Sequence, residues 1–127
     1  MAMEYWLSTK PYVFVGKKPE AVLIDGESIP VKTWKMVYKV ILQHCIQDPV
    51  YHERLMALRD RILGQQRVLI SASPDGMNSP LEICEGLYAE VHYGSQTLMH
   101  ILTIRVLTPI RYDYSHIKIR LMQEVLP

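Results

Sequence analysis

Residues 31–46 read VKTWKMVYKVILQHCI and carry the clearest helical pattern in the chain. Apolar residues recur there at intervals of three and four, at Trp34, Val37, Ile41 and Cys45. This spacing is typical of a helix that packs one face against a sheet. Thr33 stands where its hydroxyl can accept a hydrogen bond from a backbone N–H of the first turn, so we expect the helix to begin there. Trp34 is the expected core anchor, and Trp34→Ala is expected to cost about 3–5 kcal/mol.

Two strands are predicted immediately before this helix. Residues 20–24 and 28–31 flank Asp25-Gly26, a dipeptide that tolerates the positive φ angles of a tight hairpin turn. Pro30 cannot donate to a ladder, which places the second strand at a sheet edge. Residues 12–15 are β-branched and aromatic and predict a further strand before the hairpin.

The chain after residue 46 predicts two more helices and three more strands. Asp48 can cap a second helix that starts at Pro49 and runs to about Leu63, with Gly64 as its stop. The other predicted elements are a strand at 67–72, an alternating strand at 87–93, a helix at 96–107 and a closing strand at 117–122.

These elements predict an α+β fold in the order β-ββ-αα-ββ-α-β. Strands and helices do not alternate regularly, so a mostly antiparallel sheet with three helices on one face is expected. The length of 127 residues fits a single domain, 1–127, with the main pattern in 19–122 and an N-terminal segment in 1–18.

Composition narrows the classes of function. The formal net charge of +1 creates no global field that would attract nucleic acid or an anionic membrane. The first residues lack an export or membrane-spanning signal, and two cysteines do not make a disulfide framework. We therefore expect a soluble protein in the reducing cytoplasm, with no membrane partner.

Candidate chemistry is sparse. A thiol nucleophile needs a nearby imidazole, and the candidates are Cys84 and Cys45, with His92 or His116 as the base. The enzyme hypothesis that follows is a small hydrolase that uses Cys84 with His92. Neither cysteine has an activating pattern around it. The acidic residues near the turn-rich loop are expected to form a solvated strand edge; they are Glu82, Glu85 and Glu90.

Metal and cofactor binding also lack support in the sequence. His44, Cys45 and His52 lie close together but without the spacing of a zinc site. His44 and His52 are expected to be surface or boundary residues of two helices. No phosphate-binding glycine motif is present. We therefore expect no catalytic, cofactor-binding or metal-binding residue, and no enzyme.

Two binding surfaces are candidates. Nucleic acid would need a local basic patch, and the residues available for it are Arg54, Arg59, Arg61, Arg67, Lys118 and Arg120. Acidic residues such as Asp60 interrupt that patch. The leading hypothesis is a non-catalytic module that binds a protein through a sheet edge or through the turn-forming loop 73–80, at Ser73, Asp75, Met77 and Asn78.

Spaced residues in the chain resemble those of a known type of domain. They are Asp25-Gly26 after an apolar strand, Pro30-Val31-x-x-Trp34 at a helix start, Tyr88-x-Glu90, Ser95 at a helix start and Ile117-x-Ile119. The pattern covers residues 19–121 and resembles small domains of unassigned function in bacterial and phage proteins, sometimes found beside restriction or other DNA-defence enzymes. Gly94-Ser95-Gln96 departs from the Ser-Ala step of that pattern. The resemblance implies an accessory or recognition module and supplies no catalytic residue.

Overall fold

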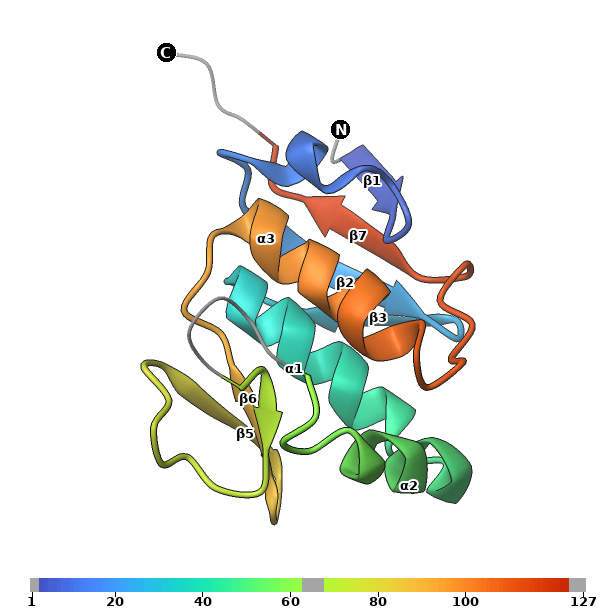
Figure 1. Ribbon diagram of the computed structural model, residues 1–127. Coiled ribbons are helices and arrows are strands. Elements are labelled where there is room, and N and C mark those ends of the chain that lie inside the picture. The colour runs from blue at the N-terminus through green and yellow to red at the C-terminus, as the bar shows by residue number, and fades with distance from the viewer. Residues whose placement is uncertain (1–2, 63–67, 124–127) are drawn as a thin grey trace.

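The computed structural model describes residues 3–62 and 68–123 and shows an α+β fold with two antiparallel sheets (Figure 1). The larger sheet has the strand order β1-β7-β2-β3. Its strands are β1 (Met3–Trp6), β2 (Pro19–Ile24), β3 (Glu27–Pro30) and β7 (Lys118–Leu121). The smaller sheet has the order β4-β6-β5, with β4 (Ile70–Ser71), β5 (Pro80–Cys84) and β6 (Leu87–Glu90).

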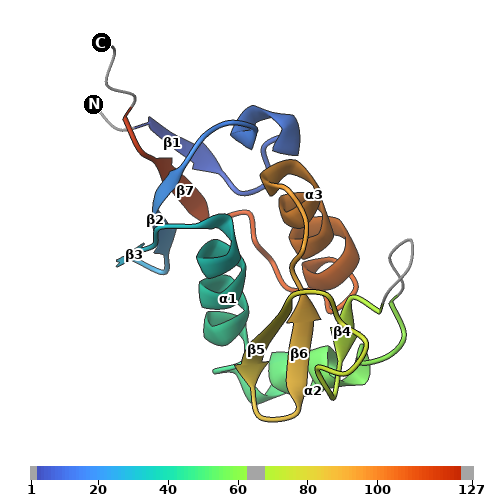
Figure 2. The same ribbon diagram turned by 90° about the vertical axis from the view of Figure 1, so that its left-hand side faces the viewer.

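The helices separate these two sheets. They are α1 (Trp34–Cys45), α2 (Pro49–Ala57) and α3 (Ser95–His100), and α3 continues as the π-helix η2 (Ile101–Leu107). Figures 1 and 2 show α1 and α3 across one face of the larger sheet, with α2 and the smaller sheet at the far end of the molecule. The opposite face of the larger sheet has no helix over it in either view.

The predicted helix starts are confirmed. The Thr33 hydroxyl accepts the N–H of Met36 at 3.1 Å, and the Asp48 carboxylate accepts the N–H of Val50 at 2.9 Å. The second helix is shorter than predicted, because the chain turns away after Ala57 and the Asp60 N–H, at φ 61°, donates to β4. Its predicted end at residues 63–64 lies outside the described residues.

The predicted hairpin is confirmed as β2 and β3. Asp25 and Gly26 have φ angles of 48° and 78°, the pair of positive values that a two-residue type I′ turn requires. Pro30 ends β3, and β3 is an edge strand as expected.

The strand predicted at residues 12–15 is wrong. Residues Pro11–Phe14 form a 3₁₀ turn, η1, that begins at a proline. Phe14 is completely buried, and its ring lies 5.0 Å from that of Trp34. Tyr12 and Val15 are 62% and 54% exposed, so a strand-like composition here belongs to a turn that sends one side chain, Phe14, into the core. The strand of this region is β1, which precedes the turn and pairs with β7.

The expectation of one sheet is also corrected. β5 was not predicted, and it pairs with β6 across a tight turn in which Gly86 has a φ of 74°. β4 pairs with the other side of β6 and is only two residues long. Since β5 lies within reach of β6 after a single turn, these strands find partners locally and do not extend the larger sheet.

Trp34 shares its anchoring role with a residue that the sequence pattern missed. Trp34 is half-buried, and its indole N–H donates to the Lys17 carbonyl at 2.9 Å. Tyr38, one turn later, is completely buried in the core. Burial raises the pKa of the Tyr38 phenol far above its usual value.

The buried Tyr38 hydroxyl makes no hydrogen bond within the described part of the chain. A buried polar atom without a partner costs about 1–3 kcal/mol. We expect Tyr38→Phe to raise the free energy of unfolding by about 1 kcal/mol in urea denaturation. Tyr12→Phe, at a side chain that is 62% exposed, is the control and should change nothing. A loss of stability in Tyr38→Phe would contradict this account.

Candidate functional site

The open side of β1 is the first candidate site. β1 is the terminal strand of the larger sheet. The Leu7 N–H donates to the Ile117 carbonyl at 2.9 Å and continues the β1–β7 register. Bonded and non-bonded pairs alternate along an antiparallel ladder, so Tyr5 bonds to β7. The backbone N–H and C=O groups of Glu4 and Trp6 therefore point away from the sheet.

The side chains beside this edge lie on the uncovered face of the sheet. Glu4 is opposite Arg120 and Trp6 is opposite Lys118, whereas the intervening Ile119 is completely buried on the other face. The Lys118 ammonium lies 4.5 Å from the centre of the Trp6 ring, a cation–π contact. The Arg120 guanidinium lies 3.2 Å from the Glu4 carboxylate. Trp6 nevertheless remains 48% exposed.

The other edges are less open. In β3, Pro30 has no N–H to offer. Beside β5, the Gln43 amide of α1 donates to the Ile83 carbonyl at 3.2 Å and the Lys35 ammonium lies 3.4 Å from the Ser79 hydroxyl. Within the described residues, β1 thus offers two outward N–H donors, those of Glu4 and Trp6, whereas β3 offers only that of Ser28.

The structure does not unite the predicted nucleic-acid patch. α2 and β7 lie at opposite ends of the molecule (Figure 1), so Arg54 on α2 is far from Lys118 and Arg120. Arg61 follows α2 and is exposed, and Arg67 lies outside the described residues.

Several of these basic groups already have intramolecular partners. The Arg54 guanidinium donates to the Ile110 carbonyl at 3.1 Å. Arg59 donates to the carbonyls of Met56 and Gly86 at 2.9 Å and 3.0 Å. These bonds use one of the five N–H donors of Arg54 and two of those of Arg59 to hold neighbouring segments of the chain.

The loop 73–80 is held by a buried carboxylate. Glu90 is 1% exposed and accepts the backbone N–H groups of Asn78, Ser79 and His92 at 2.6 Å, 2.8 Å and 3.2 Å. Glu90 therefore does not belong to a solvated strand edge, and that expectation is wrong. Strand alternation placed Glu90 on the polar face, but that face is covered by the loop.

The predicted contact residues of this loop are partly engaged in its own structure. The Ser73 hydroxyl accepts the Asp75 N–H at 3.1 Å, and the Met77 N–H donates to the Pro74 carbonyl at 3.1 Å. The Asp75 and Asn78 side chains are exposed. The loop is thus held in one conformation by its own hydrogen bonds, and its exposed side chains offer a second surface for contact with a partner.

We expect Glu90→Gln to destabilise the protein by about 2–3 kcal/mol, because an amide nitrogen would face the N–H donors and a charged acceptor is lost. Amide hydrogen exchange at Asn78 and Ser79 should accelerate with it. Glu82→Gln is the matched control, since the exposed Glu82 carboxylate accepts only the Tyr88 hydroxyl, at 2.8 Å, among the described residues. Equal effects of the two variants would contradict the role of Glu90.

Cys84 is not paired with either predicted base. Its sulfur lies 3.8 Å from Nε2 of His52, on α2. Burial and then the Glu82 carboxylate raise the pKa of the Cys84 thiol, and burial raises the pKa of Cys45 to about 12. A thiol that keeps its proton at neutral pH is a weak nucleophile. The geometry gives the hydrolase hypothesis no activated thiolate.

The raised pKa makes a prediction about alkylation. Since thiolate is the reactive form, the rate of Cys84 modification by iodoacetamide should rise with pH through a midpoint above that of free cysteine. Glu82→Gln should lower this midpoint by removing the second cause of the shift. Cys45 should react only after unfolding in urea. A Cys84 midpoint below that of free cysteine would instead indicate an activated thiol.

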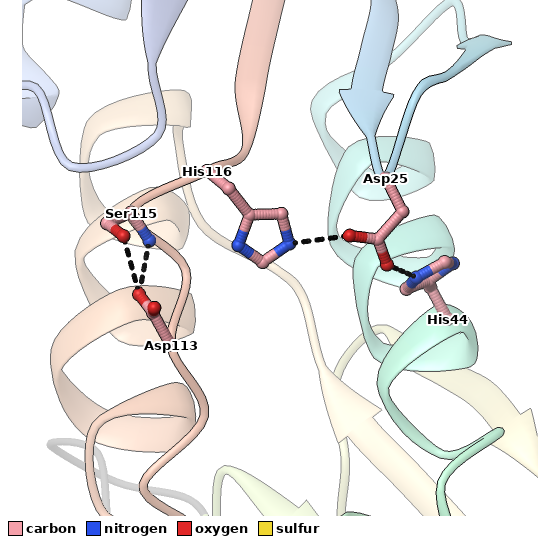
Figure 3. Close-up of polar contacts among 5 residues, drawn as sticks. All are labelled: Asp25, His44, Asp113, Ser115 and His116. Atoms are coloured by element: carbon pink, nitrogen blue, oxygen red, sulfur yellow. Dashed lines mark hydrogen bonds and ion pairs between the residues drawn. The ribbon is translucent and has the colours of Figure 1, made fainter.

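The structure joins three residues that the sequence did not connect. Figure 3 shows the Asp25 carboxylate between two imidazoles, 2.6 Å from Nε2 of His44 and 3.2 Å from Nε2 of His116. These side chains come from the β2–β3 turn, the end of α1 and the segment before β7. The cluster ties three elements together. No group of three or more His, Cys, Asp or Glu in the described residues is arranged to hold a metal ion.

Comparisons of the chain with family models, with curated proteins and with solved structures found no match. No helix in the described residues is long and apolar enough to cross a membrane.

Proposed function

We propose that this protein is a non-catalytic recognition module that binds an extended segment of a partner protein along the open edge of β1. The observation that carries the proposal is the outward direction of the Glu4 and Trp6 backbone groups beside an exposed tryptophan. An added strand would pair with these groups, as in other complexes formed by strand addition.

The backbone of β1 sets the length of this pairing. The Trp6 carbonyl already accepts the Thr9 N–H at 2.9 Å, where the chain leaves the sheet. The Glu4 N–H and C=O and the Trp6 N–H remain as the outward groups of the described strand. A short partner segment is therefore sufficient to fill the ladder.

The side chains of β1 would supply selectivity. Met3 is 59% exposed and Trp6 is 48% exposed, at the two ends of the strand. Tryptophan and methionine are enriched in protein interfaces, where they provide large contact areas. The Lys118 and Arg120 stems flank Trp6 and Glu4, so the bound segment would meet an aromatic and basic surface. An apolar segment with acidic residues complements it.

We also propose a biological setting for this protein. The resemblance to bacterial and phage domains supports a role as an accessory to a phage or DNA-defence system. The free thiols of Cys45 and Cys84 are consistent with a reducing, cytoplasmic setting. Binding to nucleic acid is the weaker alternative, because the structure divides the basic residues between two ends of the molecule.

Glu4→Pro tests the edge directly. It removes an N–H that points away from β7, so the native pairing should persist and circular dichroism should be unchanged. In affinity capture from cells that produce the protein, we expect Glu4→Pro to recover less of the partner than the wild-type protein does. Each 1.4 kcal/mol of lost binding free energy corresponds to an affinity about tenfold weaker. Trp6→Ser should reduce recovery as well.

Ser28→Pro is the matched control on the opposite edge. The Val31 N–H donates to the Glu20 carbonyl at 3.0 Å, so by the same alternation the Ser28 N–H points outward from β3. Its loss should leave recovery unchanged. Undiminished recovery by folded Glu4→Pro, or equal losses in both proline variants, would overturn the proposal. Failure of the wild-type protein to recover any partner would also count against it.

A further inference from the structure

The last helix ends with an unusual pattern of backbone hydrogen bonds. The N–H groups of Thr108 and Tyr112 donate to carbonyls five residues earlier, those of Thr103 and Leu107, at 2.9 Å and 3.0 Å. Such π-helical turns are rare and are frequent at functional sites. Here they deliver residues 108–115 to the surface next to the turn that follows β1.

These residues line a cavity of about 480 Å³. Its hydroxyl groups come from Ser8, Thr108, Tyr112, Tyr114 and Ser115. The volume lies within the range of small-molecule sites, which combine apolar walls with a few polar groups. Tyr112 and Tyr114 are both among the lining residues, and the Tyr112 ring packs edge-on against Tyr51 with the ring centres 5.0 Å apart.

Arg111 supplies the positive charge of this cavity from a strained backbone. Its φ is 61°, and the other non-glycine residues with positive φ in the described chain are aspartates, Asp25 and Asp60. Aspartate tolerates this region, whereas arginine has no local means of stabilising it. The Arg111 guanidinium, unlike those of Arg54 and Arg59, forms no hydrogen bond or ion pair with a residue that the structure describes.

Asp113 supplies the one carboxylate among the residues that line the cavity, and this carboxylate is occupied by hydrogen bonds within its own segment. One of its oxygens accepts the backbone N–H and the hydroxyl of Ser115 at 2.9 Å and 2.6 Å (Figure 3). These bonds lower the pKa of Asp113 and keep it ionised. Among the described residues, the cavity is thus lined by a cation without a partner, Arg111, and by an anion that is already hydrogen-bonded, Asp113.

We propose that this cavity binds a small phosphate monoester that also carries a planar aromatic ring, as a mononucleotide does. The phosphate would take the Arg111 guanidinium, a donor that phosphate groups prefer. The Ser115 and Thr108 hydroxyls already donate to Asp113 and to the Thr103 carbonyl. The ring would lie against the tyrosine side chains. This site is separate from the outward face of β1 and does not depend on the recognition function proposed above.

Titration of the labelled protein with four probes, followed by NMR, tests the ligand class. We expect AMP and phenyl phosphate to shift the amide signals of Arg111 and Ser115. Adenosine and inorganic phosphate each lack one half of the ligand and should bind at least about tenfold more weakly, which corresponds to one lost interaction of ordinary strength. Equal binding of inorganic phosphate and AMP would overturn the proposal, as would the absence of shifts with AMP and phenyl phosphate at millimolar concentration.

Arg111→Gly separates binding from folding. Glycine adopts positive φ without strain, so the melting temperature should rise by about 2–4 °C, while the affinity for AMP should fall at least tenfold. Arg61→Gln, at another exposed arginine, is the control and should retain affinity. Asp113→Asn removes the competing charge and should strengthen binding. Unchanged affinity in Arg111→Gly would overturn the proposal, and so would weaker binding in Asp113→Asn that still has the wild-type melting temperature.

Discussion

The apolar face of α1 imposes the arrangement of everything around it. Val37, Tyr38, Ile41, Leu42 and Cys45 are all buried on this helix. Their burial requires cover on several sides, and α1 contacts β2, α3 and β5. Because α1 and α3 fill the inner face of the larger sheet, the smaller sheet packs at the end of the helices. The outer face of the larger sheet is left to solvent.

A buried carboxylate, Glu90, and an exposed one, Asp25, then fix the loops that this arrangement creates. Glu90 satisfies the N–H groups of the loop 73–80, and Asp25 connects the hairpin turn to His44 and His116. A charged acceptor with several donors forms stronger hydrogen bonds than a neutral one. The polar groups that remain unused are therefore informative. Among those in the described residues are the outward backbone of β1 and the Arg111 guanidinium, at two different surfaces.

The sequence predicted the elements whose signals are local. Thr33 and Asp48 each bond an N–H within the first turn of their own helix, and Asp25-Gly26 makes its turn by its own φ preferences. The prediction failed where the partner is distant. Residues 12–15 carry a strand-like composition, yet Phe14 is drawn into the core beside Trp34. Strand alternation predicts that Glu90 faces solvent, yet the loop 73–80 encloses it. Asn78, which donates to Glu90, precedes it by 12 residues in the sequence.

The sequence by itself therefore determined the α+β class, the main helix and the hairpin, since hydrophobic periodicity and turn preferences act over a few residues. Only the tertiary structure decided that β1 is an edge strand of the larger sheet and that the basic residues of the predicted patch are divided between two ends of the molecule. It also decided that the Arg111 guanidinium has no partner among the described residues and lies at a hydroxyl-lined cavity. These features depend on which distant segments pack together. That choice is made by the burial of whole faces, α1 foremost, and no short stretch of residues encodes it.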